Sequence, residues 1–230
     1  MAEEKLSLVY ERLLAHFGKQ GWWPAETAFE VIVGAILTQR TSWRNTAKAI
    51  ERLKDLGFME PKRLAEAEPA EVADLIKVSG FYSEKAQRLI ATSKQIVAYG
   101  GLERLFDRTT DELRRLLLGW RGIGPETSDA ILLYAADRLS FPVDAYTLRM
   151  VARLGFKERR YIEVKTLFEA TMPRDLNTYK EFHALIDALG KTYCKAKPKC
   201  KDCPLQELCN FLEVSKEPLK SDFKTSPSVA

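Results

Sequence analysis

The sequence contains no apolar run long enough to cross a membrane, and its first residues, Met-Ala-Glu-Glu-Lys, lack the pattern of a secretory signal peptide. Internal repeats and low-complexity segments are also absent. Hydrophobic residues make up 46% of the chain and charged residues 30%, which is typical of soluble globular proteins. We therefore expect a globular protein of the cytoplasm with no membrane partner.

Strand periodicity is scarce as well, because no stretch alternates between apolar and polar residues for long. Apolar residues recur instead at helical spacing over residues 6–17, 61–76 and 84–99. Residues 29–37 are apolar almost all round, which predicts a buried central helix, and the pattern resumes over residues 46–53. The sequence therefore predicts an all-α fold.

Pro142 separates a predicted helix at residues 126–138 from another that begins near residue 144, and so marks a natural domain boundary. A chain of 230 residues can bury one large core or two modest ones. We predict two helical lobes. The predicted units are a central domain (27–141), a second domain that joins residues 1–26 to residues 142–214, and a flexible tail (215–230).

Histidine and cysteine are both few. His16 and His183 are too far apart in the sequence to predict a metal site of their own. The cysteines gather within sixteen residues, as Cys194, Cys200, Cys203 and Cys209, with lysines between them. In the cytoplasm such a cluster favours metal ligation over disulfides. Four thiolates suit either zinc or a [4Fe–4S] cluster.

The stretch Leu-Leu-Leu-Gly-Trp-Arg-Gly-Ile-Gly-Pro-Glu-Thr-Ser-Asp-Ala, residues 116–130, predicts a helix, a tight turn and a second helix. The amides of Gly122 and Gly124 would face outward at the N-terminus of the second helix, where the helix dipole favours an anion. The turn is either a phosphate-binding hairpin or an ordinary connection between core helices. The net charge of +4 permits a polyanionic partner without requiring one.

Asp144, in the segment Val-Asp-Ala-Tyr-Thr-Leu-Arg at residues 143–149, stands at the head of the next predicted helix. On its residue type and position it is an N-cap, a catalytic carboxylate or both. The hairpin, Asp144 and the cysteine spacing together resemble the endonuclease III superfamily, which are helix-hairpin-helix DNA glycosylases. The resemblance covers roughly residues 22–209.

The resemblance implies a role for each matching residue. Asp144 would be the catalytic aspartate, and Gln39 would fill the gap left by an extruded base. Gly122, Gly124 and Thr127 of the hairpin would contact DNA. The four cysteines would hold a [4Fe–4S] cluster, with zinc as the alternative. Five residues separate the first two cysteines here, whereas endonuclease III has six, so this loop is one residue shorter.

One position departs from the bifunctional members of the superfamily, in which a lysine two residues after the last hairpin glycine attacks the sugar. Here that position is Glu126, which cannot form a Schiff base. The departure predicts a monofunctional glycosylase with water as the nucleophile and no strand cleavage. Lys85, Arg88 and Arg149 are candidates for phosphate contacts, with Arg149 alternatively pairing with Asp144.

Trp22, Trp23 and Pro24 form a stiff aromatic loop, and Trp43 follows Gln39 by four residues. The tryptophans are either core or the walls of a base pocket, where cation–π stacking would select a charged, alkylated purine. These segments look most like the 3-methyladenine glycosylase branch, so the expected partner of this monomeric enzyme is double-stranded DNA with a damaged base. The alternatives are a mismatch, uracil or adenine glycosylase, a bifunctional glycosylase/AP lyase, and a non-catalytic DNA-binding iron–sulfur module.

Overall fold

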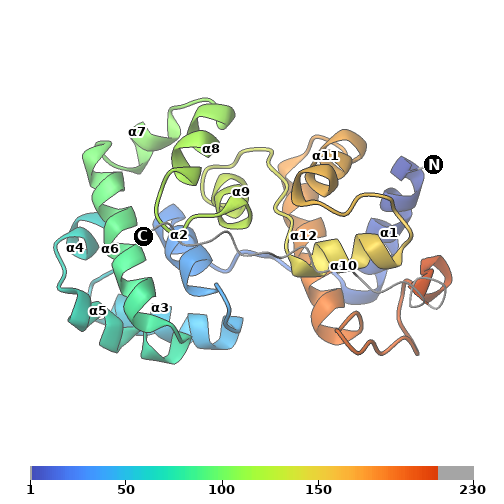
Figure 1. The fold of residues 1–230 in the computed structure, drawn as a ribbon, viewed down its shortest axis with the longest axis horizontal. Helices are drawn as coiled ribbons and strands as arrows, with labels where there is room; N and C mark the ends of the chain where they lie inside the picture. The colour runs from blue at the N-terminus through green and yellow to red at the C-terminus, as the bar shows by residue number, and fades with distance from the viewer. Residues whose placement is uncertain (1, 212–230) are drawn as a thin grey trace.

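The structure, a computed structural model, describes residues 2–211, and these residues form helices and loops with no strand. Figure 1 shows two helical lobes side by side. The first lobe contains α2 (Ala28–Leu37), α3 (Trp43–Asp55), α4 (Pro61–Ala65), α5 (Pro69–Leu75), η1 (Lys77–Ser79), α6 (Tyr82–Ala98), α7 (Leu102–Phe106), α8 (Thr110–Leu118) and α9 (Pro125–Tyr134). The second lobe contains α1 (Ala2–Phe17), α10 (Ala145–Arg153), α11 (Tyr161–Thr171), α12 (Leu176–Thr192) and η2 (Gln206–Leu208).

The all-α prediction is confirmed. Within residues 2–211 no helix has the length and apolar character needed to span a bilayer. The tail predicted at residues 215–230 lies outside the described residues.

The first lobe packs around α2, whose residues from Phe29 to Leu37 are all buried, as the sequence predicted. Thr27 begins this helix, because its hydroxyl accepts a hydrogen bond from the Glu30 amide at 3.1 Å. The Glu30 side chain is itself buried, and its carboxylate pairs with Lys54 Nζ at 2.9 Å. The helix contacts α3, α6 and α9.

Residues 127–134 of α9 are all buried, because this helix lies between two cores. Ile131 and Leu132 belong to the core of the first lobe, whereas Leu133 and Tyr134 belong to the core of the second. The latter core joins α1 to α11 and α12, and includes the stacked rings of Phe141 and Phe168. The N-terminal helix therefore packs with C-terminal helices. The boundaries at residues 26/27 and 141/142 stay a prediction.

Two predicted helices have different bounds in the structure. The helix predicted at residues 61–76 is split into α4 and α5, because Pro69 has no amide hydrogen to donate and disfavours a helical residue before it. Helix α8 is capped by Thr109, which forms a capping box with Glu112. Helix α9 ends at Tyr134, four residues before its predicted end, and Asp137 just beyond has a positive φ of 51°.

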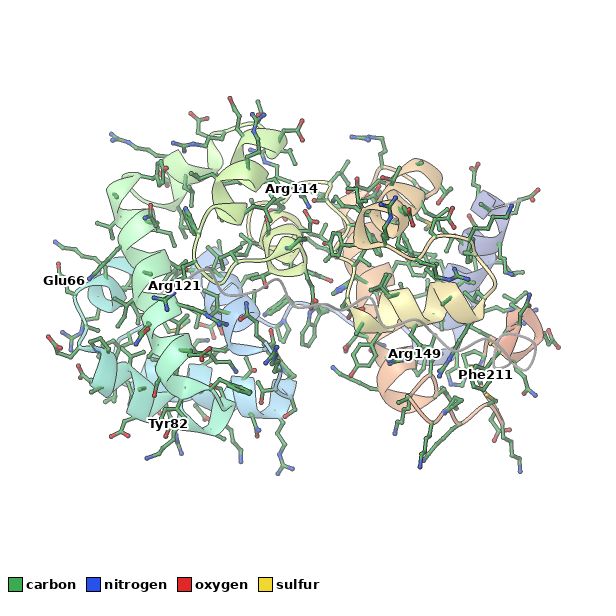
Figure 2. The ribbon with its side chains drawn as sticks, in the orientation of Figure 1. Glu66, Tyr82, Arg114, Arg121, Arg149 and Phe211 are labelled. Atoms are coloured by element: carbon green, nitrogen blue, oxygen red, sulfur yellow. The ribbon has the colours of Figure 1, made fainter. Side chains whose placement is uncertain are left out.

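A buried polar network ties α8 and α9 to α11. The Asp129 side chain is fully buried and accepts hydrogen bonds from Arg114 Nε at 2.7 Å and from the Tyr161 hydroxyl at 2.6 Å. Ser140 Oγ donates to the same carboxylate at 2.8 Å, and Lys165 Nζ lies 3.5 Å away. Figure 2 shows Arg114 where the first lobe faces the second. This network holds α9 in place against both lobes.

Candidate active site

Asp144 is the N-cap of α10, and only one of its two carboxylate oxygens is used for capping. Oδ1 accepts hydrogen bonds from the Thr147 amide at 2.7 Å and from the Thr147 hydroxyl at 2.8 Å. Oδ2 lies 3.9 Å from His183 Nε2, and 15% of the Asp144 side chain is exposed. The local sequence therefore supplies a carboxylate that is fixed through one oxygen and accessible through the other.

His183 lies on α12 and is oriented by Tyr134 of α9. The His183 Nδ1 atom is 2.9 Å from the Tyr134 hydroxyl, which is also 3.1 Å from the carbonyl oxygen of Lys180. Burial lowers the pKa of His183 from its ordinary value, against the opposing effect of the Asp144 and Asp187 charges. The imidazole is therefore neutral near pH 7.

Glu126 belongs to the first turn of α9 and lies within electrostatic range of Asp144. Desolvation of its carboxyl group, with the charge of Asp144 as the second cause, raises the pKa of Glu126 to about 7. The Glu126 residue is nonetheless exposed to solvent. Near neutral pH Glu126 is therefore partly protonated.

The three tryptophans of the predicted base pocket lie together. Trp22 and Trp43 have ring centroids 4.6 Å apart, and Trp23 and Trp43 have centroids 5.6 Å apart. Trp23 also contacts Tyr134, with centroids 5.3 Å apart. A Cβ atom at Gly34 would lie 3.1 Å from the Trp23 ring, so α2 has a glycine where the indole packs.

This aromatic cluster of Trp22, Trp23, Trp43 and Tyr134 is partly buried, and Trp23 packs against both cores. Pro24 follows it and is exposed. Because Tyr134 belongs both to the cluster and to the His183 hydrogen bonds, the aromatic cluster adjoins Asp144. Its use as a base pocket stays a prediction.

The hairpin between α8 and α9 depends on Gly122, which has a φ of +82°. Gly119 and Gly124 have negative φ angles, so the expectation that these glycines supply the left-handed turn holds at Gly122 alone. A Cβ atom at Gly122 would also lie 2.5 Å from Arg88 Cδ, whereas one at Gly124 would meet open space. Within residues 2–211 neither the Gly122 nor the Gly124 amide donates a hydrogen bond.

Gln39 and Thr127 are linked to this hairpin by hydrogen bonds. Gln39 Nε2 donates to the Gly122 carbonyl at 3.0 Å and to the Thr127 hydroxyl at 3.1 Å. Gln39 Oε1 accepts from Arg88 at 2.6 Å. Thr127 is buried. All of these side chains have protein partners in this structure, and their predicted DNA contacts remain untested.

Two basic residues differ from expectation. Lys85 is buried, and its ammonium donates to the carbonyl oxygens of Leu37 at 2.8 Å and Ser79 at 2.7 Å, so it faces no phosphate. Desolvation lowers the pKa of Lys85 to about 8. Arg149 does not pair with Asp144, because its Nε donates to the Cys194 carbonyl at 2.6 Å and its guanidinium covers the Tyr146 ring; its contact with phosphate stays a prediction.

The cysteine loop packs beside α10, on the side of the second lobe where Figure 2 labels Arg149 and Phe211. Cys194, Cys203 and Cys209 are partly buried against the core, and Cys200 is exposed. Arg153 NH1 lies 3.1 Å from Cys194 Sγ. Among residues 2–211 no three His, Cys, Asp or Glu side chains are arranged to hold a metal ion, so the cluster remains a prediction.

The sequence patterns did not identify His183, Tyr134, Asp187 or Lys191 as site residues. Tyr134 lies in an apolar run and was predicted only as helix. His183, Asp187 and Lys191 are spaced four residues apart on one face of α12, a signal that was present. Lys191 forms an ion pair with Asp187, and its ammonium lies 5.8 Å from the centroid of the Trp22 ring.

Comparison with known proteins gives consistent matches. The family described as HhH-GPD superfamily base excision DNA repair protein matches residues 33–174. A Methanocaldococcus jannaschii protein provisionally named a DNA repair glycosylase is 46% identical over 91% of this chain and 99% of its own length. Endonuclease III of Thermotoga maritima is 33% identical over 80% of this chain and 83% of its own. The solved structure of Helicobacter pylori 3-methyladenine DNA glycosylase (MagIII) bound to 1,N6-ethenoadenine is 30% identical, with a TM-score of 0.71, and the match covers 83% of this chain and 96% of that one.

Proposed function

Because this chain belongs to the HhH-GPD superfamily of base excision DNA repair proteins, we propose that it is a monofunctional DNA glycosylase acting on alkylated bases of the 3-methyladenine type in duplex DNA. The observation that carries the proposal is the position of Asp144 beside both the aromatic cluster and Glu126. The M. jannaschii relative, named a DNA repair glycosylase, and the solved MagIII structure support this choice.

Asp144 is the residue that acts on the sugar. Breaking an N-glycosidic bond develops positive charge on the deoxyribose, as in glycoside hydrolysis. The free Oδ2 oxygen stabilises that charge electrostatically, while Oδ1 stays bound to Thr147 and keeps the carboxylate in place. A preorganised carboxylate does not have to reorient as the charge develops.

Glu126 accounts for the monofunctional reaction. A carboxyl group cannot form an imine with the sugar, so it cannot take the role of the attacking lysine. Lys191 lies beside the aromatic cluster, with its ammonium 5.8 Å from the centroid of the Trp22 ring, and this ammonium is ion-paired with Asp187. Water is then the nucleophile, and an abasic site is the product.

The aromatic cluster supports a cationic alkylated base as substrate. Indole rings attract a positive charge over their faces, so they bind a methylated purine better than a neutral base. Such a base is also a good leaving group and needs no protonation. Extruding a damaged base from the duplex costs less than extruding a well-paired one, which adds to the selectivity.

The hairpin supports a DNA backbone as partner. The unpaired amides of Gly122 and Gly124 lie at the N-terminus of α9, where the helix dipole favours a phosphate. Binding of this kind weakens as salt rises, because phosphate contacts release counterions. We infer that the enzyme acts as a monomer on double-stranded DNA.

The cysteines would hold the [4Fe–4S] cluster, because the donor set consists of four thiols in one loop and the Arg153 guanidinium lies beside Cys194. A nearby cation offsets the negative charge of bound thiolates. When bound, the cluster would serve as a structural centre that fixes the lysine-rich loop against α10.

A base-release assay on randomly methylated DNA tests the proposal, with the freed bases identified by chromatography and parallel reactions trapped with borohydride. We expect release of methylated purines, no strand cleavage and no trapped adduct. Release from uracil or mismatched duplexes alone would assign the enzyme to that specificity instead. A trapped adduct lost in Lys191→Ala would make the enzyme bifunctional and overturn the proposal.

A further inference from the structure

We propose that His183 is a second catalytic residue, which together with Asp144 holds the attacking water and accepts its proton. The inference rests on the proposed function. Its basis is the 3.9 Å separation between His183 Nε2 and Asp144 Oδ2, which is too long for a direct hydrogen bond and suits one bridging water.

The hydrogen bonds of Tyr134 determine which imidazole nitrogen carries the proton. The single hydroxyl hydrogen of Tyr134 is donated to the Lys180 carbonyl at 3.1 Å. His183 Nδ1, 2.9 Å from the same oxygen, must then be the donor in that contact. In a neutral ring this leaves a lone pair on Nε2, facing Asp144 Oδ2.

Two acceptors without a hydrogen between them are satisfied by a molecule that donates twice. Water has two hydrogens, so one water donates to both Nε2 and Oδ2 and presents its own lone pair elsewhere. Because Asp144 also faces the sugar in the proposed function, that lone pair is available to C1′ of the deoxyribose.

The groups around the ring suit a base that works near neutral pH. Asp144 faces the ring from the start of α10, Tyr134 faces it from α9, and Asp187 and Lys191 lie on α12 itself. Burial favours the neutral ring before reaction, and the two carboxylates stabilise the imidazolium formed during it. His183 can therefore gain a proton without leaving an uncompensated charge.

The water oxygen forms a bond to C1′ as the C1′–N bond breaks, and the bonding electron pair leaves with the base. One water proton moves to His183 Nε2. A cationic alkylated base departs neutral, so no proton donor is needed, and the imidazolium later returns its proton to solvent.

His183→Gln tests the inference, with His16→Gln as the matched control. His16 is the other histidine, it also contacts a tyrosine hydroxyl (Tyr193, at 3.1 Å), and it is exposed. Single-turnover base release should fall about a hundredfold in His183→Gln, the usual contribution of a general base. Affinity for duplex DNA should not change, and His16→Gln should match wild type.

The pH profile separates a base from a structural role. After subtraction of enzyme-free release at each pH, the wild-type rate should fall as pH drops through the titration of His183. That acid limb should persist in Glu126→Gln, which removes a carboxyl group whose pKa is raised to about 7, and disappear in His183→Gln. Tyr134→Phe, which keeps the ring and removes the hydroxyl, should lose about tenfold in rate.

The role of His183 and the proposed glycosylase activity are refuted by different results. Wild-type rates and an unchanged acid limb in His183→Gln, with base release still abolished in Asp144→Asn, would overturn the role of His183 alone. If His183→Gln were to unfold, a wild-type rate in Tyr134→Phe would have the same meaning. A wild-type enzyme that releases no base would remove the proposed function and the role of His183 together.

Discussion

Replacing Asp129 with alanine should destabilise the protein more than any surface substitution. The buried carboxylate accepts hydrogen bonds from Arg114, Tyr161 and Ser140, so its removal takes the acceptor away from one cation and two hydroxyls. Removing one partner of a buried ion pair lowers the free energy of unfolding by about 3–5 kcal/mol. For a chain of this size, that lowers the melting temperature by roughly 10 °C.

Urea unfolding at pH 7 measures the free energy of unfolding of Asp129→Ala. Two further variants show how much of the loss comes from one hydrogen bond and how much a surface ion pair would contribute. Tyr161→Phe removes one hydroxyl that donates to a charged acceptor at 2.6 Å, and should cost about 1.5–3 kcal/mol. Asp74→Ala breaks an ion pair with Lys77, in which the Asp74 side chain is 81% exposed, and should cost about 1 kcal/mol or less.

Equal losses in Asp129→Ala and Asp74→Ala would refute this reasoning. The carboxylate would then contribute no more than a surface charge, and the link between α8, α9 and α11 would have to come from apolar packing alone.

Three further predictions concern the site and the cysteine loop. In the folded protein the pKa of Glu126 is raised to about 7. Between about pH 4.5 and 7 the folded protein therefore binds more protons than the unfolded chain, and its free energy of unfolding falls as pH rises through that window. Glu126→Gln should flatten this fall, which urea titrations at pH 5 and 8 would detect, and an unchanged slope would contradict the assignment. Gly122→Ala should cost about 1–2 kcal/mol of stability, because φ is +82° and Arg88 occupies the space, whereas Gly124→Ala should keep its stability and lose only DNA affinity. Iron and sulfide analysis of the purified protein should find an iron–sulfur cluster that Cys200→Ser weakens, and stoichiometric zinc without iron would favour the alternative metal.

Much of the fold is readable from the sequence because its signals are local. The buried α2 follows from a run of apolar residues, and the hairpin follows from glycines and a proline at fixed spacing. Asp144 as an N-cap follows from a carboxylate just ahead of a helix. Each of these depends on neighbours within a few residues.

The missed features depend on contacts between distant segments. Asp129 contacts Tyr161 and Lys165 only once α9 lies against α11. No residue near Asp129 in the sequence indicates that its carboxylate is buried at the centre of a polar network. Likewise, His183 comes to Asp144 only when α12 packs on α10. Lys85 belonged to a charged stretch, yet it is buried, because two carbonyl oxygens at the ends of other elements require a donor.

Single-turnover base release by Asp144→Asn on methylated DNA tests most directly whether this carboxylate performs the reaction. Asparagine keeps an oxygen to accept from Thr147, so α10 should remain capped and the fold and DNA affinity should match wild type. With the charge beside the sugar lost, we predict a fall in rate of at least about a hundredfold. Base release at the wild-type rate by a folded, DNA-binding Asp144→Asn protein would contradict the mechanism.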